Sequence, residues 1–322
     1  MKKKVAIISG ITGQDGAYLS ALLAKEHYTI IGLTRSSHNF SKKNFLYLNI
    51  DSEIIIEECD LLDFSSIIKI LIKYKPDEFY NLAAQSSVGV SFEQPIGTLN
   101  YNTQSVLNIL ESVRLLQLET KIYQASSSEM FGKVSTLPVD EHTPFHPLSP
   151  YAISKASGFW IGVNYRESYK VFCVNGILFN HESYLRSPNF FVKKVIRTSL
   201  EIKKGFKNEL RVGNIDVKRD FGYAPDYVKA MWLSLQQDKP DDYLICSGTS
   251  IYLREIINYT FDYLNIVKTK LVEDPKLFRP TEMNDMYGDN SKAKSVLGWD
   301  YNQSFFSVLD ILIEEEDKNF KI

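Results

Sequence analysis

The sequence of 322 residues is poor in cysteine and has no long apolar run. Its three cysteines, Cys59, Cys173 and Cys246, show no pair spacing, which excludes a cysteine metal motif and a disulfide framework and favours a reducing compartment. No apolar segment approaches the roughly 20 residues that span a bilayer, and the V-A-I-I run after the N-terminal lysines is too short for a signal peptide. We therefore expect a cytoplasmic protein with no membrane partner and no bound metal.

The sequence also lacks an excess of basic charge. Its 37 lysines and arginines are matched by 39 acidic residues, for a formal net charge of −2. A nucleic-acid-binding protein normally presents a basic face, so we expect no nucleic acid partner. The length fits one large domain or two modest ones.

Short β-branched runs alternate with helical patterns along the first half of the chain. We expect strands at residues 4–9, 29–33, 54–57, 78–82 and 121–125, and helices at 64–74, 103–116 and 150–169. Strands and helices that alternate at these lengths form a parallel, doubly wound sheet. The expected fold class is therefore α/β, a Rossmann-type sheet with a smaller, mixed C-terminal region that binds substrate.

A glycine-rich turn follows the first expected strand. The segment G-I-T-G-Q-D-G places Gly10, Gly13 and Gly16 between that strand and a helical pattern. Glycines at such a turn let the backbone approach a pyrophosphate, which the N-terminus of the helix then faces. The segment indicates a dinucleotide-binding site, with a purely structural turn as the alternative.

The end of the second expected strand bears on the identity of the dinucleotide. An acidic residue normally holds a ribose 2′-hydroxyl there, but the sequence has Thr34, Arg35, Ser36 and Ser37. A cation and hydroxyls suit a 2′-phosphate. We predict NADP as the cofactor, with NAD as the alternative; Arg35 also fits an ordinary loop cation.

Tyr151 and Lys155 stand four residues apart in S-P-Y-A-I-S-K, after a proline that marks a helix start. Residues four apart share a helix face. A lysine ammonium there stabilises phenolate, so that Tyr151 exchanges a proton near neutral pH. Taken alone, the motif also fits a partly buried tyrosine beside a lysine that extends to solvent.

Residues 124–132, Q-A-S-S-S-E-M-F-G, follow the fifth expected strand. Ligands bind at this carboxyl edge of doubly wound sheets. Ser127 supplies a hydroxyl, and Glu129 adds a carboxylate that could remove a proton next to a ketone and help to expel water. The alternative is that Glu129 caps the following turn.

Cations are the candidate phosphate ligands of the second half of the chain. Lys193, Lys194 and Arg197 lie on an expected helix at 190–204 and suit a diphosphate, or else form a solvated basic face. Arg279 could take a phosphate and Glu282 a pair of ribose hydroxyls.

Other polar residues of the second half are less specific. Arg219 is followed by Asp220, so a structural ion pair is an alternative to ligand binding. Of the five histidines, only His181 is placed in the site. The acidic tail from 314 onward is expected to be a solvated end.

These motifs together resemble the extended short-chain dehydrogenases/reductases, which combine G-x-x-G-x-x-G with Y-x-x-x-K. Longer stretches resemble the GDP-mannose 4,6-dehydratase family, notably Q-A-S-S-S-E-M-F-G-K-V, N-G-I-L-F-N-H-E-S, G-N-I-D-V-K-R-D-F-G-Y-A-P-D-Y-V-K-A-M-W and F-R-P-T-E. The resemblance extends from the first strand to about Trp299. The segment A-A-Q-S-S-V-G-V-S-F-E-Q-P is more similar to relatives that act on GDP-manno-heptose.

The resemblance implies a lyase that converts GDP-mannose or GDP-manno-heptose to the 4-keto-6-deoxy sugar, with internal return of hydride through the bound cofactor. The alternatives are a GDP-sugar C4 dehydrogenase or reductase without dehydration, and a catalytically silent protein. Residues 1–178 with 214–246 would form the dinucleotide-binding domain, and 179–213 with 247–322 the nucleotide-sugar-binding region. A homodimer or homotetramer is implied, with the helices at 103–116 and 151–169 in a four-helix dimer interface.

The resemblance also assigns site residues by position. The catalytic residues are Ser127, Glu129, Tyr151 and Lys155. The cofactor-binding residues are Gly10, Thr12, Gly13, Gln14, Asp15, Gly16, Arg35, Asp60, Leu61, Leu82, Ala83, Ala84, Ser86, Lys155, His181 and Arg186. The substrate-binding residues are Ser86, Asn180, Lys193, Arg219, Arg279 and Glu282. The chain departs from the family at Tyr184-Leu185, where the family has Pro-Arg, and in a shorter segment after Arg35, which in the family reaches a neighbouring subunit's cofactor.

Overall fold

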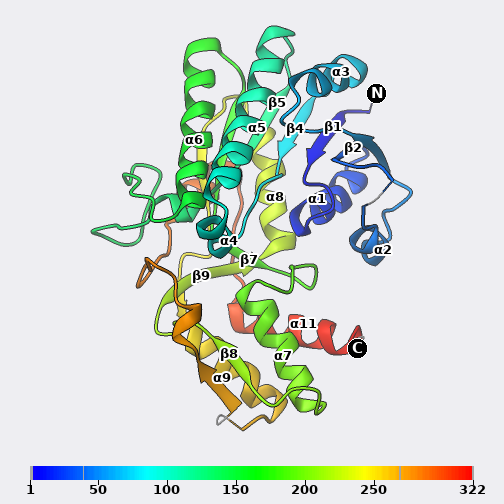
Figure 1. Ribbon diagram of the computed structural model, residues 1–322. Coiled ribbons are helices and arrows are strands. Elements are labelled where there is room, and N and C mark those ends of the chain that lie inside the picture. The colour runs from blue at the N-terminus through cyan, green and yellow to red at the C-terminus, as the bar shows by residue number, and fades with distance from the viewer. Residues whose placement is uncertain (1–2, 39, 268–269, 321–322) are drawn as a thin grey trace.

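A seven-stranded parallel sheet organises the protein, whose computed structural model describes residues 3–38, 40–267 and 270–320. Its strands are β1 (Val5–Ser9), β2 (Thr29–Thr34), β3 (Ile54–Glu58), β4 (Glu78–Asn81), β5 (Lys121–Ser127), β6 (Cys173–Leu178) and β10 (Asp242–Ile245). They lie in the order β10-β6-β5-β4-β1-β2-β3 (Figure 1). The order reverses between β1 and β4, which confirms the predicted doubly wound α/β fold.

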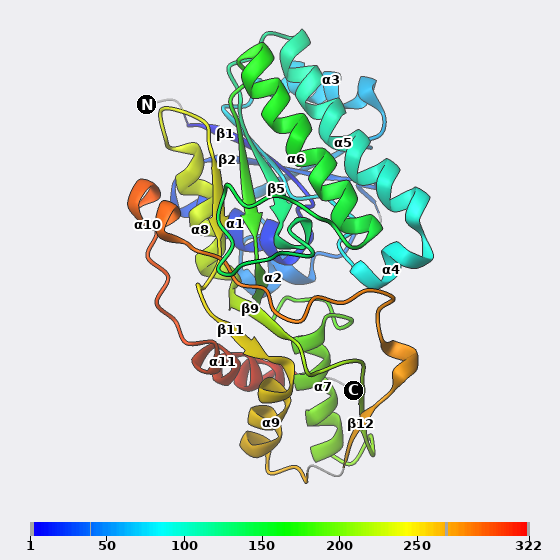
Figure 2. The ribbon, with the colours of Figure 1, turned by 90° about the vertical axis from the view of Figure 1, so that its left-hand side faces the viewer.

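Helices cover both faces of this sheet (Figures 1 and 2). One face carries α3 (Phe64–Tyr74), α5 (Pro95–Leu115) and α6 (Pro150–Tyr169), and the other carries α1 (Gln14–Lys25) and α8 (Ala224–Leu235). In β1, Ile7 packs into the core under α3 and α5, whereas Ala6 and Ile8 pack into the core with α1 and α8. Burial on both faces explains why this strand is a continuous apolar run in the sequence.

The chain leaves the sheet after β6 and returns to it as β10. Between them lie β7 (Asn180–Glu182), α7 (Phe191–Lys203), β8 (Leu210–Val212), β9 (Lys218–Tyr223) and then α8. After β10 follow β11 (Ser250–Tyr252), α9 (Leu253–Leu264), β12 (Leu271–Glu273), α10 (Ser291–Leu297) and α11 (Phe305–Lys318).

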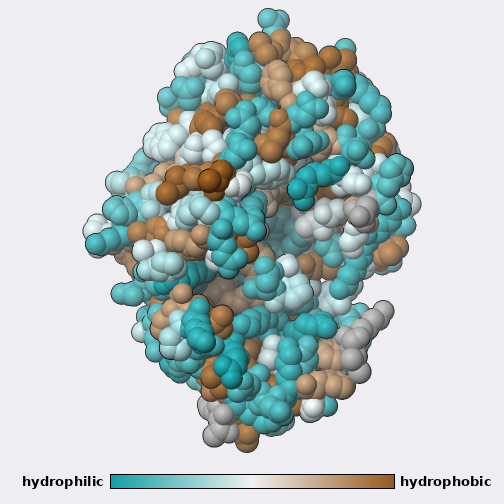
Figure 3. Space-filling view, in the orientation of Figure 1, coloured by the Kyte–Doolittle hydropathy of each residue, from teal (hydrophilic) through white to brown (hydrophobic). Residues whose placement is uncertain are grey.

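These segments, apart from α8 and α10, which pack on the large sheet, build the smaller region that the sequence predicts. Strand β9 pairs in parallel with β7 and antiparallel with β11, and β8 pairs with β12. Helices α7, α9 and α11 share a core of their own that includes Val195, Phe261 and Val308. The region lies beneath the carboxyl edge of the large sheet, and the surface is hollowed where the two parts meet (Figures 1 and 3).

Some elements differ from the sequence prediction. Two short helices, α2 (Lys43–Leu48) and α4 (Val88–Glu93), were not predicted, and α5 starts at Pro95 instead of residue 103. The prediction that the acidic tail is a solvated end is wrong, because α11 runs to Lys318 and buries Glu316. No helix among the described residues has the length and apolar character required to cross a bilayer.

Candidate active site

The carboxyl end of β5 and the turn after it carry two of the predicted catalytic residues. Ser127 is the last residue of β5, and a short 3-10 helix at Ser128–Met130 presents Glu129. The Ser127 Oγ accepts a hydrogen bond from the Glu129 backbone N–H at 3.3 Å. The turn itself thus fixes the backbone of Glu129 beside the Ser127 hydroxyl, so the predicted adjacency of the two residues has a local cause.

Helix α6 brings Tyr151 and Lys155 to the same place. The helix begins at Pro150, and the hydroxyl of the preceding Ser149 accepts from the Ala152 N–H at 3.1 Å, an N-cap. Tyr151 and Lys155 are both buried. Tyr151 is hydrogen-bonded with the Ser127 side chain, and the Lys155 ammonium donates to the Ala125 carbonyl oxygen at 2.8 Å. Ser127, Tyr151 and Lys155 thus form one group.

Burial governs the protonation of this pair. Burial raises the pKa of Tyr151 to about 12, against the lowering effect of its hydrogen bond with Ser127. Burial lowers the pKa of Lys155 to about 8, against the charge of Asp15. The Lys155 nitrogen lies 5.9 Å from the centre of the Tyr151 ring, so its ammonium is bonded to Ala125 instead of to the phenol. The Tyr151 phenol therefore keeps its proton at neutral pH in this arrangement, which differs from the predicted proton exchange near neutral pH. For Tyr151 to accept a substrate proton, the Lys155 ammonium must leave Ala125 and approach the phenol.

A residue that the sequence analysis missed, Asn102 of α5, ties this helix pair to the loop after β4. Its amide donates to the Ser154 hydroxyl of α6 at 2.9 Å. The same side chain accepts from the Gln85 N–H at 2.9 Å and donates to the Gln85 carbonyl at 3.0 Å. Asn102 therefore fixes the segment 82–86 relative to the first turns of α6. No local motif signals this role, because the three partners lie far apart in the sequence.

Glu129 faces a cluster of alternating charges from the smaller region. An Arg279 nitrogen lies 3.5 Å from the Glu129 carboxylate and 3.7 Å from that of Glu282. Arg219 of β9 is buried and pairs with Glu282 at 2.5 Å. The ion-pair partner of Arg219 is thus Glu282, and Asp220 instead accepts hydrogen bonds from the backbone of Ser247 and Gly248. Three predicted substrate residues, Arg219, Arg279 and Glu282, therefore meet at the predicted base.

The glycine turn after β1 packs against the loop after β4. Gly10 has a φ of +69°, and a Cβ there would lie 2.9 Å from the Ala83 nitrogen. The Ser9 hydroxyl accepts from the N–H groups of Leu82 and Ala83, at 3.2 Å each. Gly13, by contrast, is exposed at the N-terminus of α1. The turn leaves backbone and helix N-terminus open on the side where a pyrophosphate would bind, which fits a dinucleotide.

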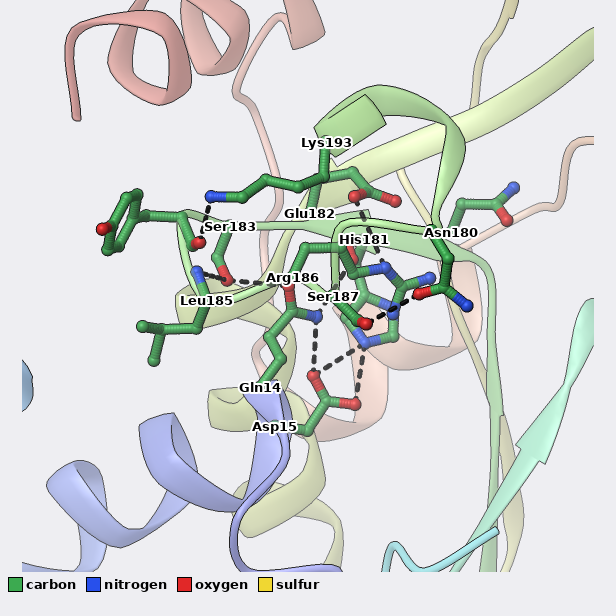
Figure 4. A network of polar contacts seen from close by, with 12 residues as sticks. Gln14, Asp15, Asn180, His181, Glu182, Ser183, Leu185, Arg186, Ser187 and Lys193 are labelled. Carbon is green, nitrogen blue, oxygen red and sulfur yellow. Dashed lines mark hydrogen bonds and ion pairs between the residues drawn. The ribbon is translucent and has the colours of Figure 1, made fainter. Parts of the chain in front are cut away.

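A contact network joins the first turn of α1 to β7 (Figure 4). His181 Nε2 lies 3.0 Å from both Asp15 carboxylate oxygens. The Gln14 amide donates to the His181 carbonyl at 3.1 Å and accepts from the Ser183 hydroxyl at 2.7 Å. Gln14, Asp15 and His181, three predicted cofactor residues, therefore meet in space although 166 residues separate Asp15 from His181.

The remaining predicted cofactor residues lie along the carboxyl edge from β2 to β4. Arg35 is exposed just after β2, and the charges of Arg35 and Asp60 both act on Tyr101 of α5. The Leu61 carbonyl accepts from Asn108 at 2.9 Å, and the Thr12 carbonyl accepts from Asn44 at 2.9 Å. Tyr101 was not identified from the sequence, because nothing local links α5 to the end of β2.

Three predicted residues have partners away from Glu129. The Lys193 ammonium is bonded to the buried Glu316 carboxylate of α11 and to the Tyr184 carbonyl. Arg186 lies 3.4 Å from Glu182 and stacks over the Phe190 ring at 3.7 Å. The Asn180 amide donates to the Asp220 carbonyl at 3.0 Å. In this structure Lys193 is half of a buried ion pair and not part of a solvated basic face.

The doubly wound sheet, the open glycine turn and the Ser127–Tyr151–Lys155 group define a short-chain dehydrogenase/reductase of the extended form. The chain belongs to the GDP-mannose 4,6-dehydratase family, because the family model described as "GDP-mannose 4,6 dehydratase" matches residues 7–312. GDP-mannose 4,6 dehydratase 1 of Arabidopsis thaliana is 44% identical over 325 residues, covering 98% of this chain and 90% of that protein.

Solved structures share the fold at lower identity. A dTDP-glucose 4,6-dehydratase from Streptomyces venezuelae with NAD and TYD bound matches with a TM-score of 0.88 at 18% identity, over 98% of this chain and 97% of that chain. RMD from Pseudomonas aeruginosa complexed with NADPH matches with a TM-score of 0.83 at 24% identity, over 98% of this chain and 99% of that chain. At these identities the likeness establishes the fold.

Proposed function

We propose that this protein is a GDP-sugar 4,6-dehydratase that works through a bound nicotinamide cofactor. The observation that carries the proposal is the position of Glu129, held by its own turn beside Ser127 and within electrostatic reach of Tyr151. A simple oxidoreductase needs the hydroxyl, the tyrosine and the lysine only. A carboxylate at this place adds the acid–base group that elimination of water requires. The family relationship supports the same activity.

In the proposed reaction Tyr151 accepts the proton of the sugar 4-hydroxyl, and Ser127 orients that hydroxyl. The ketone at C4 acidifies the proton on C5, which Glu129 removes. The 6-hydroxyl leaves as water with a proton from Glu129 or Ser127. Tyr151 then gives its proton to C5 as C6 is reduced, so the ketone stays at C4 in the product. A nicotinamide cofactor held at the glycine turn and beside Lys155 would supply the hydride chemistry needed at C4 and C6, with no net cofactor turnover.

The cofactor is proposed to lie along the carboxyl edge of the sheet. The glycine turn with Thr12 and the backbone N–H groups of Gln14 and Asp15 would hold the pyrophosphate. Asp60 and Leu61 would hold the adenine, and the segment 82–86 the nicotinamide half, with Lys155 on its ribose. Arg35 favours NADP because it is an exposed cation at the end of β2. Glu58 favours NAD, because its carboxylate reaches Ser37 at 2.9 Å and brings a negative charge to the same place.

An affinity comparison separates the two cofactors. If NADP is bound through Arg35, Arg35→Gln should weaken the affinity for NADP and leave the affinity for NAD unchanged in a fluorescence titration. Equal affinities of the unaltered protein for both would favour an NAD-type site.

The charged cluster around Glu129 is proposed to bind the nucleotide end of the substrate. Arg279 is the exposed cation and suits a phosphate oxygen, and Glu282 suits ribose hydroxyls. Arg219 is buried against Glu282 and orients it. Ser86, Asn180 and Arg186 complete the proposed contacts with substrate and cofactor. Lys193 stays a proposed substrate residue only if a diphosphate displaces Glu316 from it.

The assignment is tested by mass spectrometry of the nucleotide sugar after incubation with GDP-mannose or, separately, GDP-manno-heptose, while nicotinamide absorbance is followed. Loss of one water without net cofactor reduction is the expected result, and the faster substrate names the sugar. Loss of two hydrogens with matching cofactor reduction would mean a C4 dehydrogenase. No change in either sugar, with intact nucleotide binding, would mean a silent protein.

Two further proposals concern organisation. Residues 1–178 with 214–246 are proposed as the dinucleotide-binding domain and 179–213 with 247–322 as the sugar-nucleotide domain. A homodimer is proposed through α5 and α6, because this helix pair exposes Ile96, Ile153 and Trp160 to solvent; a tetramer would need a further surface. The three cysteines are buried and unpaired, which supports a reducing compartment such as the cytoplasm.

A further inference from the structure

The side chain of His181 is enclosed by acceptors. It is buried on β7, with its ring stacked on Tyr227 of α8 at 4.8 Å between centroids. Its Nδ1 lies 2.7 Å from the Phe179 carbonyl oxygen, and its Nε2 lies 3.0 Å from each oxygen of Asp15. Figure 4 shows the ring pointing from β7 toward the first turn of α1.

Both ring nitrogens must carry a proton in this arrangement. A carbonyl oxygen only accepts hydrogen bonds, and so does an ionised carboxylate, whereas a neutral imidazole has one N–H and one bare nitrogen. A neutral His181 would direct a lone pair at Phe179 or at Asp15. The charged form satisfies both contacts, and it also places a cation against a carboxylate in a site from which most water is excluded.

The net effect of the charged groups around the ring also favours the charged form of His181. Burial lowers the pKa of His181, but the charge and hydrogen bond of Asp15 raise it by more, so the net shift is upward. Arg186 opposes the imidazolium, and the nearby Glu182 carboxyl of β7 favours it. Burial raises the pKa of Asp15, but the charge and hydrogen bond of His181 outweigh it and the pKa falls to about 2.

The position of Asp15 gives this pair a consequence for ligand binding. Asp15 lies in the first turn of α1, where free N–H groups and the helix dipole favour an anion. An uncompensated carboxylate there would repel a pyrophosphate. It would also raise the pKa of Tyr151 further, because the charge of Asp15 already acts on both Tyr151 and Lys155.

We propose that His181 is a positioning residue which, as an imidazolium, anchors the first turn of α1 to β7 through Asp15 and cancels a carboxylate charge that would oppose an anionic dinucleotide. This role differs from the direct cofactor contact that the resemblance implies. The proposal rests on the proposed function in one respect, that the turn binds a nicotinamide dinucleotide. The charge state of His181 itself does not depend on that function.

The charge state is tested first, in the full-length protein without ligand. Long-range ¹H–¹⁵N correlation spectra of protein labelled at histidine nitrogens would be recorded from pH 5.5 to 8.5, with His181 assigned from the His181→Asn spectrum. The other four histidines are exposed and serve as references in the same spectra. His181 should keep both ring protons at pH 7.5, and in Asp15→Asn it should become neutral at that pH. A neutral ring in the unaltered protein at pH 7 would overturn the proposal.

The consequence for binding is tested with a double-mutant cycle. His181→Asn should weaken the affinity for the dinucleotide, measured by fluorescence titration, by about tenfold or more, because it leaves Asp15 uncompensated. His181→Asn with Asp15→Asn should recover most of that loss, because no charge remains. His142→Asn, a substitution of an exposed histidine, is the matched control and should bind as the unaltered protein does. Circular dichroism and the melting temperature report whether each variant is folded.

The outcomes distinguish a failure of the positioning role of His181 from a failure of the proposed function. If folded His181→Asn binds the dinucleotide normally, or if the double variant is no better than the single one, the positioning role is wrong. If the unaltered protein binds neither NADP nor NAD while His181 remains protonated in the spectra, the proposed function fails and the charge assignment survives.

Discussion

At the scale of single residues, Glu129 separates a dehydratase from a simple oxidoreductase. Its backbone N–H is fixed by Ser127, while its carboxylate faces the cation of Arg279. The ion pair of 3.5 Å with a partly exposed arginine does not tie the carboxylate in a close hydrogen bond. The turn sets the position of the backbone, and the carboxylate stays available to a substrate.

Glu129→Gln should abolish formation of the deoxy-keto product while leaving oxidation at C4 in place. The amide keeps the shape of the side chain but cannot remove the C5 proton, so the dehydration rate should fall roughly 10²- to 10⁴-fold. Rapid mixing with GDP-mannose should still show a single burst of cofactor reduction. Glu141→Gln is the control, because the Glu141 carboxylate accepts a hydrogen bond from the Leu244 N–H. This variant should form product as the unaltered protein does. Product at the unaltered rate from Glu129→Gln would refute the base assignment.

The sequence predicts which residues share the site where those residues lie close together in the chain. Ser127 and Glu129 are two apart on one turn, and Tyr151 and Lys155 are four apart on one helix, so spacing alone brings them together. The partners Arg279 and Glu129 are 150 residues apart in the chain, and only the fold joins them. The same holds for Asn102 and for Glu316, which no spacing rule reaches.

At the scale of secondary-structure elements, the start of α6 is set by its cap. The Ser149 hydroxyl accepts from the Ala152 N–H, and Pro150 occupies the first turn. Ser149→Ala should destabilise the protein by about 1 kcal/mol, measured by urea unfolding. Ser304→Ala is a matched control, because Ser304 is the N-cap of α11 and makes no capping hydrogen bond. Equal destabilisation by both changes would mean that the cap of α6 contributes nothing specific.

Helix α11 is held by its buried carboxylate. Glu316 pairs with Lys193 and Arg197 of α7, and the neighbouring Glu315 accepts from the Tyr47 hydroxyl of α2 at 2.7 Å. Glu316→Gln leaves the buried Lys193 ammonium without its counter-ion, so we expect a loss of about 3–5 kcal/mol in the free energy of unfolding. Glu314→Gln on the exposed side of α11 should change stability by less than about 0.5 kcal/mol. Similar losses for both variants would contradict the ion-pair role.

Element prediction succeeded where apolar runs and glycines set the pattern. The helix at Phe64–Tyr74 and five of the seven strands of the large sheet follow from burial on one or both faces, whereas β6 and β10 were not predicted. The short helices α2 and α4 did not stand out, because six residues give less than two turns of periodicity. The run of acidic residues at the end of α11 drew attention away from its apolar face. Val308, Leu309 and Leu312 form that face and pack into the core of the smaller region.

At the scale of the whole molecule, the Asp15–His181 pair should shape the dependence of stability on pH. The pKa of Asp15 is lowered from its ordinary 3.8 to about 2, so its contribution is present above pH 3.8 and lost as the pH falls toward 2. The pKa of His181 is raised from its ordinary 6.5, so its contribution is present below pH 6.5 and lost as the pH rises through the higher folded value. The stabilisation is therefore complete between pH 3.8 and 6.5.

The melting temperature measured from pH 5 to 9 checks this dependence. The difference in melting temperature between the unaltered protein and the Asp15→Asn, His181→Asn double variant should shrink as the pH rises above 6.5. A difference that stays constant to pH 9 would show that the pair does not titrate in this range.

The assembly also belongs to this scale. Trp160 of α6 is 59% exposed and Ile96 of α5 is 83% exposed. A dimer interface would remove these apolar side chains from water, which is favourable. Trp160→Glu should convert the proposed dimer to a monomer in light scattering coupled to gel filtration, because it would place two carboxylates near the symmetry axis. Phe206→Glu, at an exposed aromatic residue of the smaller region, should leave the mass unchanged. A monomeric unaltered protein would refute the dimer.

The late return of the chain to the large sheet has a consequence for synthesis on the ribosome. Strand β6 is buried along its whole length, and β10, its outer partner, begins only at Asp242. Until that residue has left the exit tunnel, the nascent chain presents β6 as an unpaired apolar edge, the kind of surface that recruits other strands. Chains truncated between residues 178 and 242 should therefore be held by chaperones or aggregate after their release, whereas chains that end after residue 246 can close the sheet.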